Sequence, residues 1–152
     1  MGPQISLSNI SLSFGEEPIF DNLNLLIHPR DRIALVGRNG SGKSTLLKVL
    51  HGLVIQDQGD RILSKGISIG YMEQDPNLSK FTTLSDYVYS GMPESSFHLI
   101  EITGKSLGID LEVSISDSSG GERRRAALTK LIVGDHDIML LDEPTNHLDV
   151  EA

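Results

Sequence analysis

The sequence predicts an α/β fold with a parallel central sheet, preceded by an N-terminal antiparallel β subdomain and accompanied by a short helical subdomain. Two observations support this prediction. Residues 32–36 form a largely apolar run that is followed by a glycine-rich loop and then by helix-forming residues. Residues 138–141 form a second apolar run, which ends in two carboxylates. Apolar runs of this kind, separated by helical segments, are typical of parallel strands that are buried on both faces.

The composition predicts one soluble globular domain that spans residues 1–152, because 38% of the residues are hydrophobic and 22% are charged. No apolar run approaches the roughly 20 residues that cross a bilayer, so no direct membrane insertion is expected. The net charge of −8 argues against non-specific binding of nucleic acid. The absence of cysteine excludes disulfides and thiolate metal sites, and it agrees with a cytoplasmic location.

The N-terminal residues predict a β-hairpin. Apolar and polar residues alternate over residues 5–14, and a change of phase between Leu7 and Ile10 indicates a strand with a bulge. Residues 15–18 have the composition of a turn, and residues 23–27 alternate again as a second strand. Two neighbouring strands joined by a short turn are expected to pair antiparallel.

The glycine-rich loop has the spacing G-x-x-x-x-G-K-S, with a buried strand predicted over residues 33–36 and a helix from about Lys43 to Leu50. Glycines let backbone N–H groups turn toward a phosphate, and the helix N-terminus attracts the same anion. Lys43 would bind the terminal phosphates, and the Ser44 hydroxyl would bind Mg²⁺. The alternative is a glycine-rich turn before an ordinary helix. The predicted nucleotide-binding residues of this loop are Gly37, Asn39, Gly40, Ser41, Gly42, Lys43, Ser44 and Thr45.

The middle of the chain is predicted to contain short elements. These are strands over residues 61–63 and 67–71, a polar loop over 72–76, helices over 84–89, 97–107 and 121–133, and a loop over 114–118. Ser119 and Glu122 have the spacing of a capping box. Gly120 and Gly121 between them would expose a helix N-terminus to phosphate, and the alternative is a well-capped helix alone.

The carboxylates Asp142 and Glu143 follow the second apolar run. In an open α/β sheet, the carboxyl end of a buried strand lies at the crevice where ligands bind. Asp142 would then hold Mg²⁺ through water, and Glu143 would orient or deprotonate an attacking water molecule. The alternative is an ordinary strand end.

These motifs, in this order, resemble the nucleotide-binding cassette of the ABC ATPase superfamily over nearly the whole chain, which implies a P-loop NTPase core. The resemblance identifies residues 37–45 as the Walker A motif, 138–142 as Walker B, 118–122 as the signature motif and 146–149 as the D-loop. It implies that Glu143 is the catalytic carboxylate of an ATPase. It also implies that Gln74 completes the Mg²⁺ shell and that Phe14 stacks on adenine.

In this family two cassettes close head to tail around ATP. The resemblance therefore implies that Ser119, Gly120 and Gly121 act on ATP held by a second cassette, either in the same polypeptide or in a homodimer. ATP and Mg²⁺ are the expected cofactors.

Residues 119–125 and 143–149 resemble the soluble ABC-F proteins, which have two cassettes and no membrane domain, and many of which act on ribosomes. This resemblance predicts a cytoplasmic ATPase with a role in translation. One alternative is the ATP-binding subunit of an ABC membrane transporter, whose partner would be a transmembrane subunit. Another is a module that binds nucleotide without hydrolysis in order to assemble with a partner. Arg123 to Arg125 are either a partner contact or solvated helix charges.

The sequence departs from the family pattern in three places. Ser118 stands where the family usually has leucine, and this change is expected to loosen the packing beneath the signature motif. The segment between Gln74 and Ser119 is short, so the helical subdomain, at about residues 77–133, is expected to be compressed. None of the five histidines fits the family's switch histidine, which is expected beyond residue 152. The sequence therefore predicts a fragment that hydrolyses ATP poorly by itself.

Overall fold

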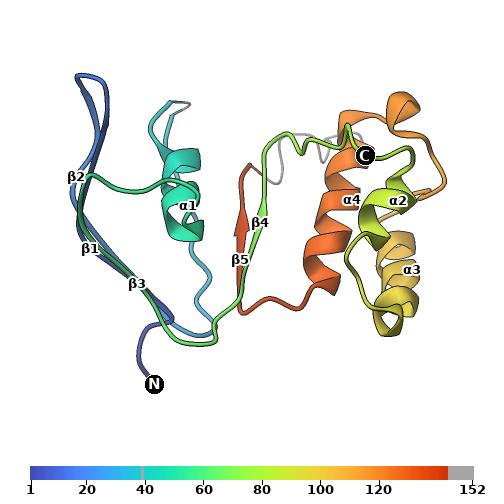
Figure 1. The fold of residues 1–152 in the computed structure, drawn as a ribbon, viewed down its shortest axis with the longest axis horizontal. Helices are drawn as coiled ribbons and strands as arrows, with labels where there is room; N and C mark the ends of the chain where they lie inside the picture. Colours follow the sequence, from blue (N-terminus) through green and yellow to red (C-terminus); the bar gives the residue numbers. More distant parts are fainter. Residues whose placement is uncertain (39, 144–152) are drawn as a thin grey trace. The chain divides into compact units, whose positions relative to one another are not determined.

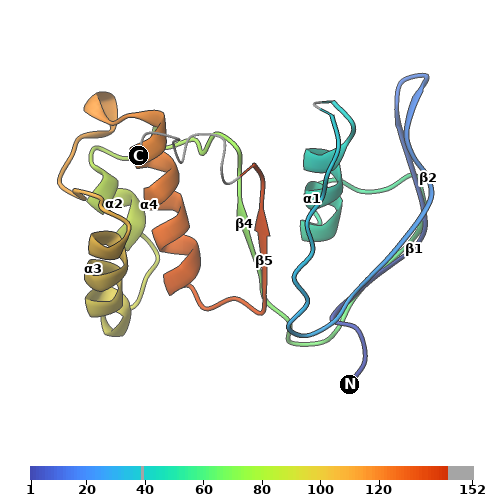
Figure 2. The same ribbon diagram turned by 180° about the vertical axis from the view of Figure 1, so that it is seen from behind.

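The computed structural model describes residues 1–38 and 40–143, so the predictions for Asn39 and for residues 146–149 lie outside the described residues. The chain divides into two compact units, Met1–Ile69 and Gly70–Ala152. Figures 1 and 2 show the elements of each unit from two sides.

The first unit contains a three-stranded antiparallel sheet in the order β2-β1-β3. Its strands are β1 (Ile5–Phe14), β2 (Glu17–Ile27) and β3 (Gln58–Leu63). The predicted hairpin is confirmed, although β2 begins several residues earlier than expected. Ile5 and Leu7 are buried, and the buried positions resume at Ile10 after a shift of register.

The predicted bulge in β1 is confirmed by Asn9, whose φ of 52° lies in the left-handed region that asparagine tolerates better than most residues. Gly59 of β3 lies against this bulge with a φ of +92°. A Cβ at this position would collide with the carbonyl oxygens of Ser8 and Asn9. A glycine is therefore required where β3 passes the bulge.

Helix α1 (Lys43–His51) is the predicted helix after the glycine-rich loop, and it buries Leu46, Leu47, Val49 and Leu50. The helix ends at Gly52, whose φ of 94° gives the left-handed cap. The Arg61 guanidinium of β3 donates two hydrogen bonds to the Leu50 carbonyl oxygen, at 3.0 Å from Nε and 2.6 Å from Nη2. These bonds satisfy a carbonyl in the last turn of the helix and join α1 to the sheet.

The prediction of a buried strand over residues 33–36 is wrong. This segment has no regular secondary structure, and the side chain of Val36 is 94% exposed. A strand needs a neighbour that satisfies its backbone hydrogen bonds, and the three-stranded sheet of this unit does not include these residues. An apolar run alone cannot specify whether such a neighbour is present.

A two-stranded sheet is formed by β4 (Ile69–Met72) and β5 (Ile138–Leu141), and apart from Ile69 its residues belong to the second unit. The two strands run in the same direction (Figure 1). A parallel pairing was predicted for residues 138–141, and the neighbour of that strand is β4. Ile138 and Leu140 are buried, whereas Met139 is 51% exposed. The expectation that β5 is buried on both faces is therefore wrong for the described residues. Because helix α4 (Gly120–Val133) packs on Met72 through Ala127 and Leu131, the sheet is covered on this face.

The predicted helices of the second unit are confirmed as α2 (Leu84–Tyr89), α3 (Phe97–Ser106) and α4. Two 3₁₀ turns, Glu94–Ser96 and Ile115–Asp117, lie between them, and the second replaces part of a predicted loop. The helices share a core whose buried residues are Leu78, Leu84, Val88, Ile100, Ala126 and Val133. None of the described helices is both long and apolar enough to cross a membrane.

Lys130 joins α4 to the end of α2. Its ammonium group donates to the carbonyl oxygens of Tyr87, at 3.0 Å, and Ser90, at 2.8 Å. The same group lies 4.9 Å from the centroid of the Tyr87 ring. Burial lowers the pKa of Lys130, and the carbonyl groups at the helix end stabilise its charge.

Candidate functional site

The glycine-rich loop of the first unit folds back on itself. The Lys43 ammonium donates to the Gly37 carbonyl oxygen at 2.6 Å, so the last part of the loop lies over its beginning. Within the loop, the Ser41 N–H donates to the Arg38 carbonyl oxygen at 3.1 Å. Gly42 caps helix α1 with a φ of 94° and provides no side-chain hydrogen bond. The first N–H groups of the helix are thus not bonded by a capping side chain, and an anion can bind there.

Strand β2 contacts this loop. A Cβ at Gly42 would lie 2.9 Å from Ile19 Cγ2 and 3.3 Å from Phe20 Cε1. A second strand beginning only at residue 23, as the alternation of residues 23–27 predicts, does not include this contact. The apolar pair Ile19-Phe20 directly after Pro18 is the signal that would have extended the strand. Ser44 and Thr45, also predicted to bind nucleotide, lie in the first turn of α1.

Phe14 is the last residue of β1, and 55% of its surface is exposed. Strand alternation alone would assign this side chain to the core. Its exposure instead leaves an aromatic ring available to a ligand, as the family resemblance predicts for adenine stacking. Phe14 belongs to the same compact unit as the glycine-rich loop.

Asp142 of the second unit directly follows β5 and is only 4% exposed. Its N–H donates to the Met72 carbonyl oxygen at 3.1 Å, which continues the pairing of β5 with β4. A hydrogen bond joins its carboxylate to Tyr71 of β4. Burial, the negative charges of Asp142 and Glu73, and this hydrogen bond raise the pKa of Tyr71 from 10.0 to about 12. Tyr71 was not predicted to belong to this site, because no local pattern in the sequence links it to Asp142.

The raised pKa of Tyr71 predicts a loss of stability at high pH. Folding favours the neutral phenol, so its contribution is present below pH 10 and is lost as the pH rises to about 12. We expect the Tyr71→Phe chain to lose less unfolding free energy over this interval than the unmodified chain.

Urea denaturation at several pH values would measure this difference, and absorbance at 295 nm would follow the phenols directly. Only three tyrosines are present. The titration step at the highest pH should disappear in Tyr71→Phe and remain in the control Tyr89→Phe. Persistence of that step in Tyr71→Phe would contradict the assignment.

Gln74 and Glu143, both predicted to act on the nucleotide, lie together in the second unit. Gln74 Nε2 donates to Glu143 Oε2 at 2.8 Å. Glu143 has a φ of 45°, a left-handed conformation that is uncommon for glutamate. Within the second unit, the carboxylate of Asp142 and the amide of Gln74 supply oxygen donors of the kind that Mg²⁺ prefers, so these residue types fit this ion. In the first unit, the Ser44 hydroxyl is a donor of the same kind.

The signature segment begins helix α4 with the predicted capping box. Ser119 Oγ accepts from the Glu122 N–H at 3.1 Å, and Glu122 Oε1 accepts from the Ser119 N–H at 3.2 Å. The space next to Gly120 is open. The Ser118 hydroxyl is hydrogen-bonded on two sides. It donates to the Ile115 carbonyl oxygen at 2.7 Å and accepts from Arg123 Nε at 2.8 Å.

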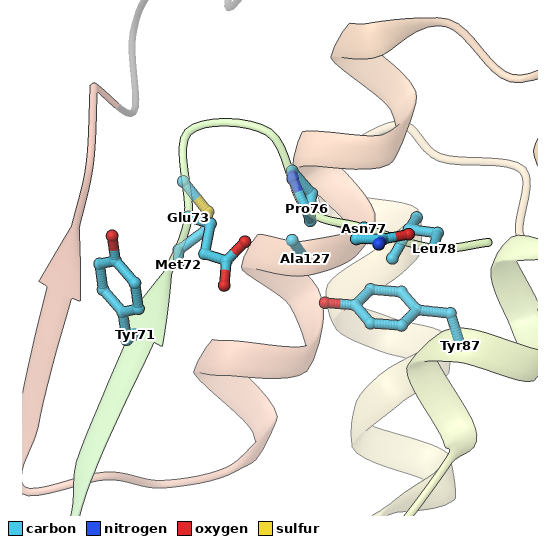
Figure 3. Close-up of a pocket in the computed structure, with 8 residues that line it drawn as sticks. All are labelled: Tyr71, Met72, Glu73, Pro76, Asn77, Leu78, Tyr87 and Ala127. Carbon is cyan, nitrogen blue, oxygen red and sulfur yellow. The ribbon is translucent and has the colours of Figure 1, made fainter. Parts of the chain in front are cut away.

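A pocket of about 200 Å³ lies in the second unit beside the loop that carries Gln74. Its lining residues are Tyr71, Met72, Glu73, Pro76, Asn77, Leu78, Tyr87 and Ala127 (Figure 3). The Glu73 carboxylate and the Tyr87 hydroxyl point toward each other across Ala127. Burial and the charge of Glu73 raise the pKa of Tyr87. The pocket therefore combines two phenol rings and one carboxylate with apolar side chains in its lining.

Residues 20–146 match the family model described as ABC transporter. The chain is 41% identical to the ATP-binding protein Uup of Caulobacter vibrioides over 99% of this chain and 24% of that protein. It is 32% identical to Uup of Escherichia coli over 97% of this chain and 30% of that protein. Identity to the energy-dependent translational throttle protein EttA of Mycobacterium tuberculosis is 30%, over 97% of this chain and 34% of that protein. The chain thus spans about a quarter to a third of the length of these relatives.

Among solved structures, the chain is similar to an inward-facing metal-chelate type ABC transporter, with a TM-score of 0.77 and 26% identity. That match covers 99% of this chain and 63% of the other. An Atm1-family ABC exporter with ATP bound matches with a TM-score of 0.83 and 23% identity, over 98% of this chain and 30% of that one. At this identity the second match indicates the fold alone.

Proposed function

Because this chain belongs to the ABC transporter family, we propose that it binds Mg-ATP and hydrolyses it as one cassette of an ABC-F-like pair. The single observation that best supports this proposal is the glycine-rich loop, in which Lys43 folds back over Gly37 at the start of α1. A loop of this form places one ammonium beside a helix N-terminus that has no capping side chain, and both attract a polyphosphate. Several charge-assisted hydrogen bonds, each contributing about 1.5–3 kcal/mol, are sufficient for micromolar affinity.

The proposed roles follow the predicted motifs. Residues 37–45 bind the phosphates, and Ser44, Gln74 and Asp142 hold Mg²⁺, which supplies positive charge to the γ-phosphate when it is bound. Glu143 accepts the proton of the attacking water. The signature residues Ser119, Gly120 and Gly121 contact ATP held by a second cassette, in the same polypeptide or in a homodimer.

We propose a cytoplasmic location and a role in translation for this chain, with the ribosome as partner. This assignment is supported by its similarity to EttA, which is named as a translational throttle protein. The second candidate is an ATP-binding subunit that acts with a transmembrane transporter subunit, and the likeness to a metal-chelate type transporter supports it. Co-sedimentation of the protein with ribosomes in Mg-ATP would favour the first candidate, and a neighbouring transmembrane gene product that binds it would favour the second.

Calorimetry and light scattering test the proposal for the chain itself. We expect micromolar binding of Mg-ATP, weaker binding without Mg²⁺, and an increase in mass toward a dimer in Mg-ATP but not in buffer. Steady phosphate release from ATP would demonstrate the enzyme activity. The proposal of ATP binding would be abandoned if saturating Mg-ATP produced neither heat of binding nor thermal stabilisation.

Phe14→Ala is expected to weaken ATP binding by about fivefold, because loss of one partly solvated stacking contact costs about 1 kcal/mol. Titration calorimetry with Mg-ATP measures this loss of affinity. Leu26→Ala is the matched control, since Leu26 is a similarly exposed side chain in the same sheet. Equal affinities of the unmodified chain for ADP and GDP would remove the support for adenine stacking.

A further inference from the structure

Arg124 is the one buried cation among residues 1–38 and 40–143. Only 3% of its surface is exposed, although a run of three arginines in a helix is usually solvated. The expectation of a solvated charge is therefore wrong for this residue. Removing a guanidinium from water is costly, and the cost is recovered only where the group makes strong hydrogen bonds.

The hydrogen bond of Arg124 leads to the proposed catalytic carboxylate. Arg124 Nη1 donates to the Glu143 main-chain carbonyl oxygen at 2.8 Å. Its Nε has no partner within the described part of the chain. The neighbouring arginines bond elsewhere: Arg123 to Ser118 and Ile115, and Arg125 to the Gly121 carbonyl of its own helix.

Two hydrogen bonds hold Glu143, one at its main chain and one at its side chain. Its main-chain carbonyl accepts from Arg124, and its side-chain carboxylate accepts from Gln74 at 2.8 Å. A left-handed φ of 45° in a non-glycine residue costs energy and persists only where surrounding contacts maintain it. The bond from a buried, charged donor is a contact of this kind.

We propose that Arg124 is a positioning residue for Glu143, which holds the peptide of the catalytic carboxylate in its left-handed conformation. This inference rests on the proposed function in one respect, which is that the proposed function makes Glu143 the catalytic base. Arg124 lies four residues after Gly120, about one helical turn from the N-terminus of α4. It therefore lies on the helix that begins at the signature motif, and it donates to the residue to which we assign the activation of water.

The first test uses the full chain with Arg124→Met, which keeps an unbranched apolar stem of similar length and removes the donors. At saturating Mg-ATP we expect at least tenfold slower hydrolysis in a single turnover, with an ATP affinity within twofold of the unmodified chain. Arg124→Lys keeps a charged donor and should recover part of the rate. Arg125→Met is the matched control and should remain within twofold.

The rate loss caused by Arg124→Met should be absent in a Glu143→Gln background, because Arg124 acts through Glu143. An unchanged rate in a folded Arg124→Met chain would overturn the proposal. An equal rate loss in the Glu143→Gln background would overturn it too, since it would indicate a role independent of that carboxylate.

Hydrogen–deuterium exchange gives a readout that does not depend on hydrolysis. Arg124→Met should increase exchange in peptides containing Asp142 and Glu143 at least fivefold, while peptides from α2 and α3 remain protected. A purely structural role would instead increase exchange along α2, α3 and α4. If the unmodified chain shows no turnover, the proposed catalytic function fails on that result. Unchanged exchange at Asp142 and Glu143 would independently overturn the positioning role.

Discussion

Glu143→Gln is expected to slow ATP hydrolysis by about 10²–10⁴-fold, the range by which general bases accelerate such reactions. Glutamine has nearly the same shape as glutamate but cannot accept the proton of the attacking water. Its amide oxygen can still accept from Gln74, which donates to Glu143 at 2.8 Å in the structure. The substitution therefore removes the base and preserves this local hydrogen bond.

Phosphate release under single-turnover conditions measures this effect, and calorimetry on the same sample shows whether ATP binding is preserved. We expect the affinity to change by less than threefold. Glu73→Gln is the matched control, because it removes a carboxylate from the same unit without touching the proposed base. Equal hydrolysis rates for the unmodified and Glu143→Gln chains would exclude Glu143 from the mechanism.

Lys43→Ala is expected to weaken Mg-ATP binding at least tenfold, which corresponds to about 1.4 kcal/mol. The substitution removes the positive charge proposed for the terminal phosphates. It also removes the hydrogen bond from Lys43 to the Gly37 carbonyl oxygen at 2.6 Å, so the loop loses a contact that keeps it folded. The loss of the positive charge and the loss of the hydrogen bond both weaken nucleotide binding.

Titration calorimetry with Mg-ATP measures the change, and thermal melting without nucleotide shows that the variant is folded. Lys48→Ala serves as the control, because Lys48 is an exposed lysine of the same helix α1. An unchanged affinity in Lys43→Ala would contradict the phosphate contact and would require a different site for the nucleotide.

The structural elements that depend on residues close together in the chain were predictable from the sequence. The capping box of Ser119 and Glu122, the glycine end of α1 and the bulge at Asn9 each depend on a few adjacent positions, and the structure contains all three. The resemblance to an ABC-F-like cassette, which depends on the order of short motifs, is confirmed by the family match and by the Uup and EttA relatives. The assignment of individual residues to ATP and Mg²⁺ stays a prediction.

The features that depend on distant partners were not predictable. Residues 33–36 are as apolar as those of β5, yet the segment is not a strand in the structure, because apolarity specifies no hydrogen-bonding neighbour. Three consecutive arginines look equivalent in the sequence, and only the packing of α4 buries Arg124 against Glu143.

The spacing of residues along the chain is therefore enough to identify the family, the local elements and the residue types available to a nucleotide, because all of these depend on short-range order. The contacts of Tyr71 with Asp142 and of Gln74 with Glu143 join residues about 70 positions apart in the chain, and they become visible in the folded chain. Contacts across such separations arise when strands and helices pack, and no local pattern of side chains records which of them will meet.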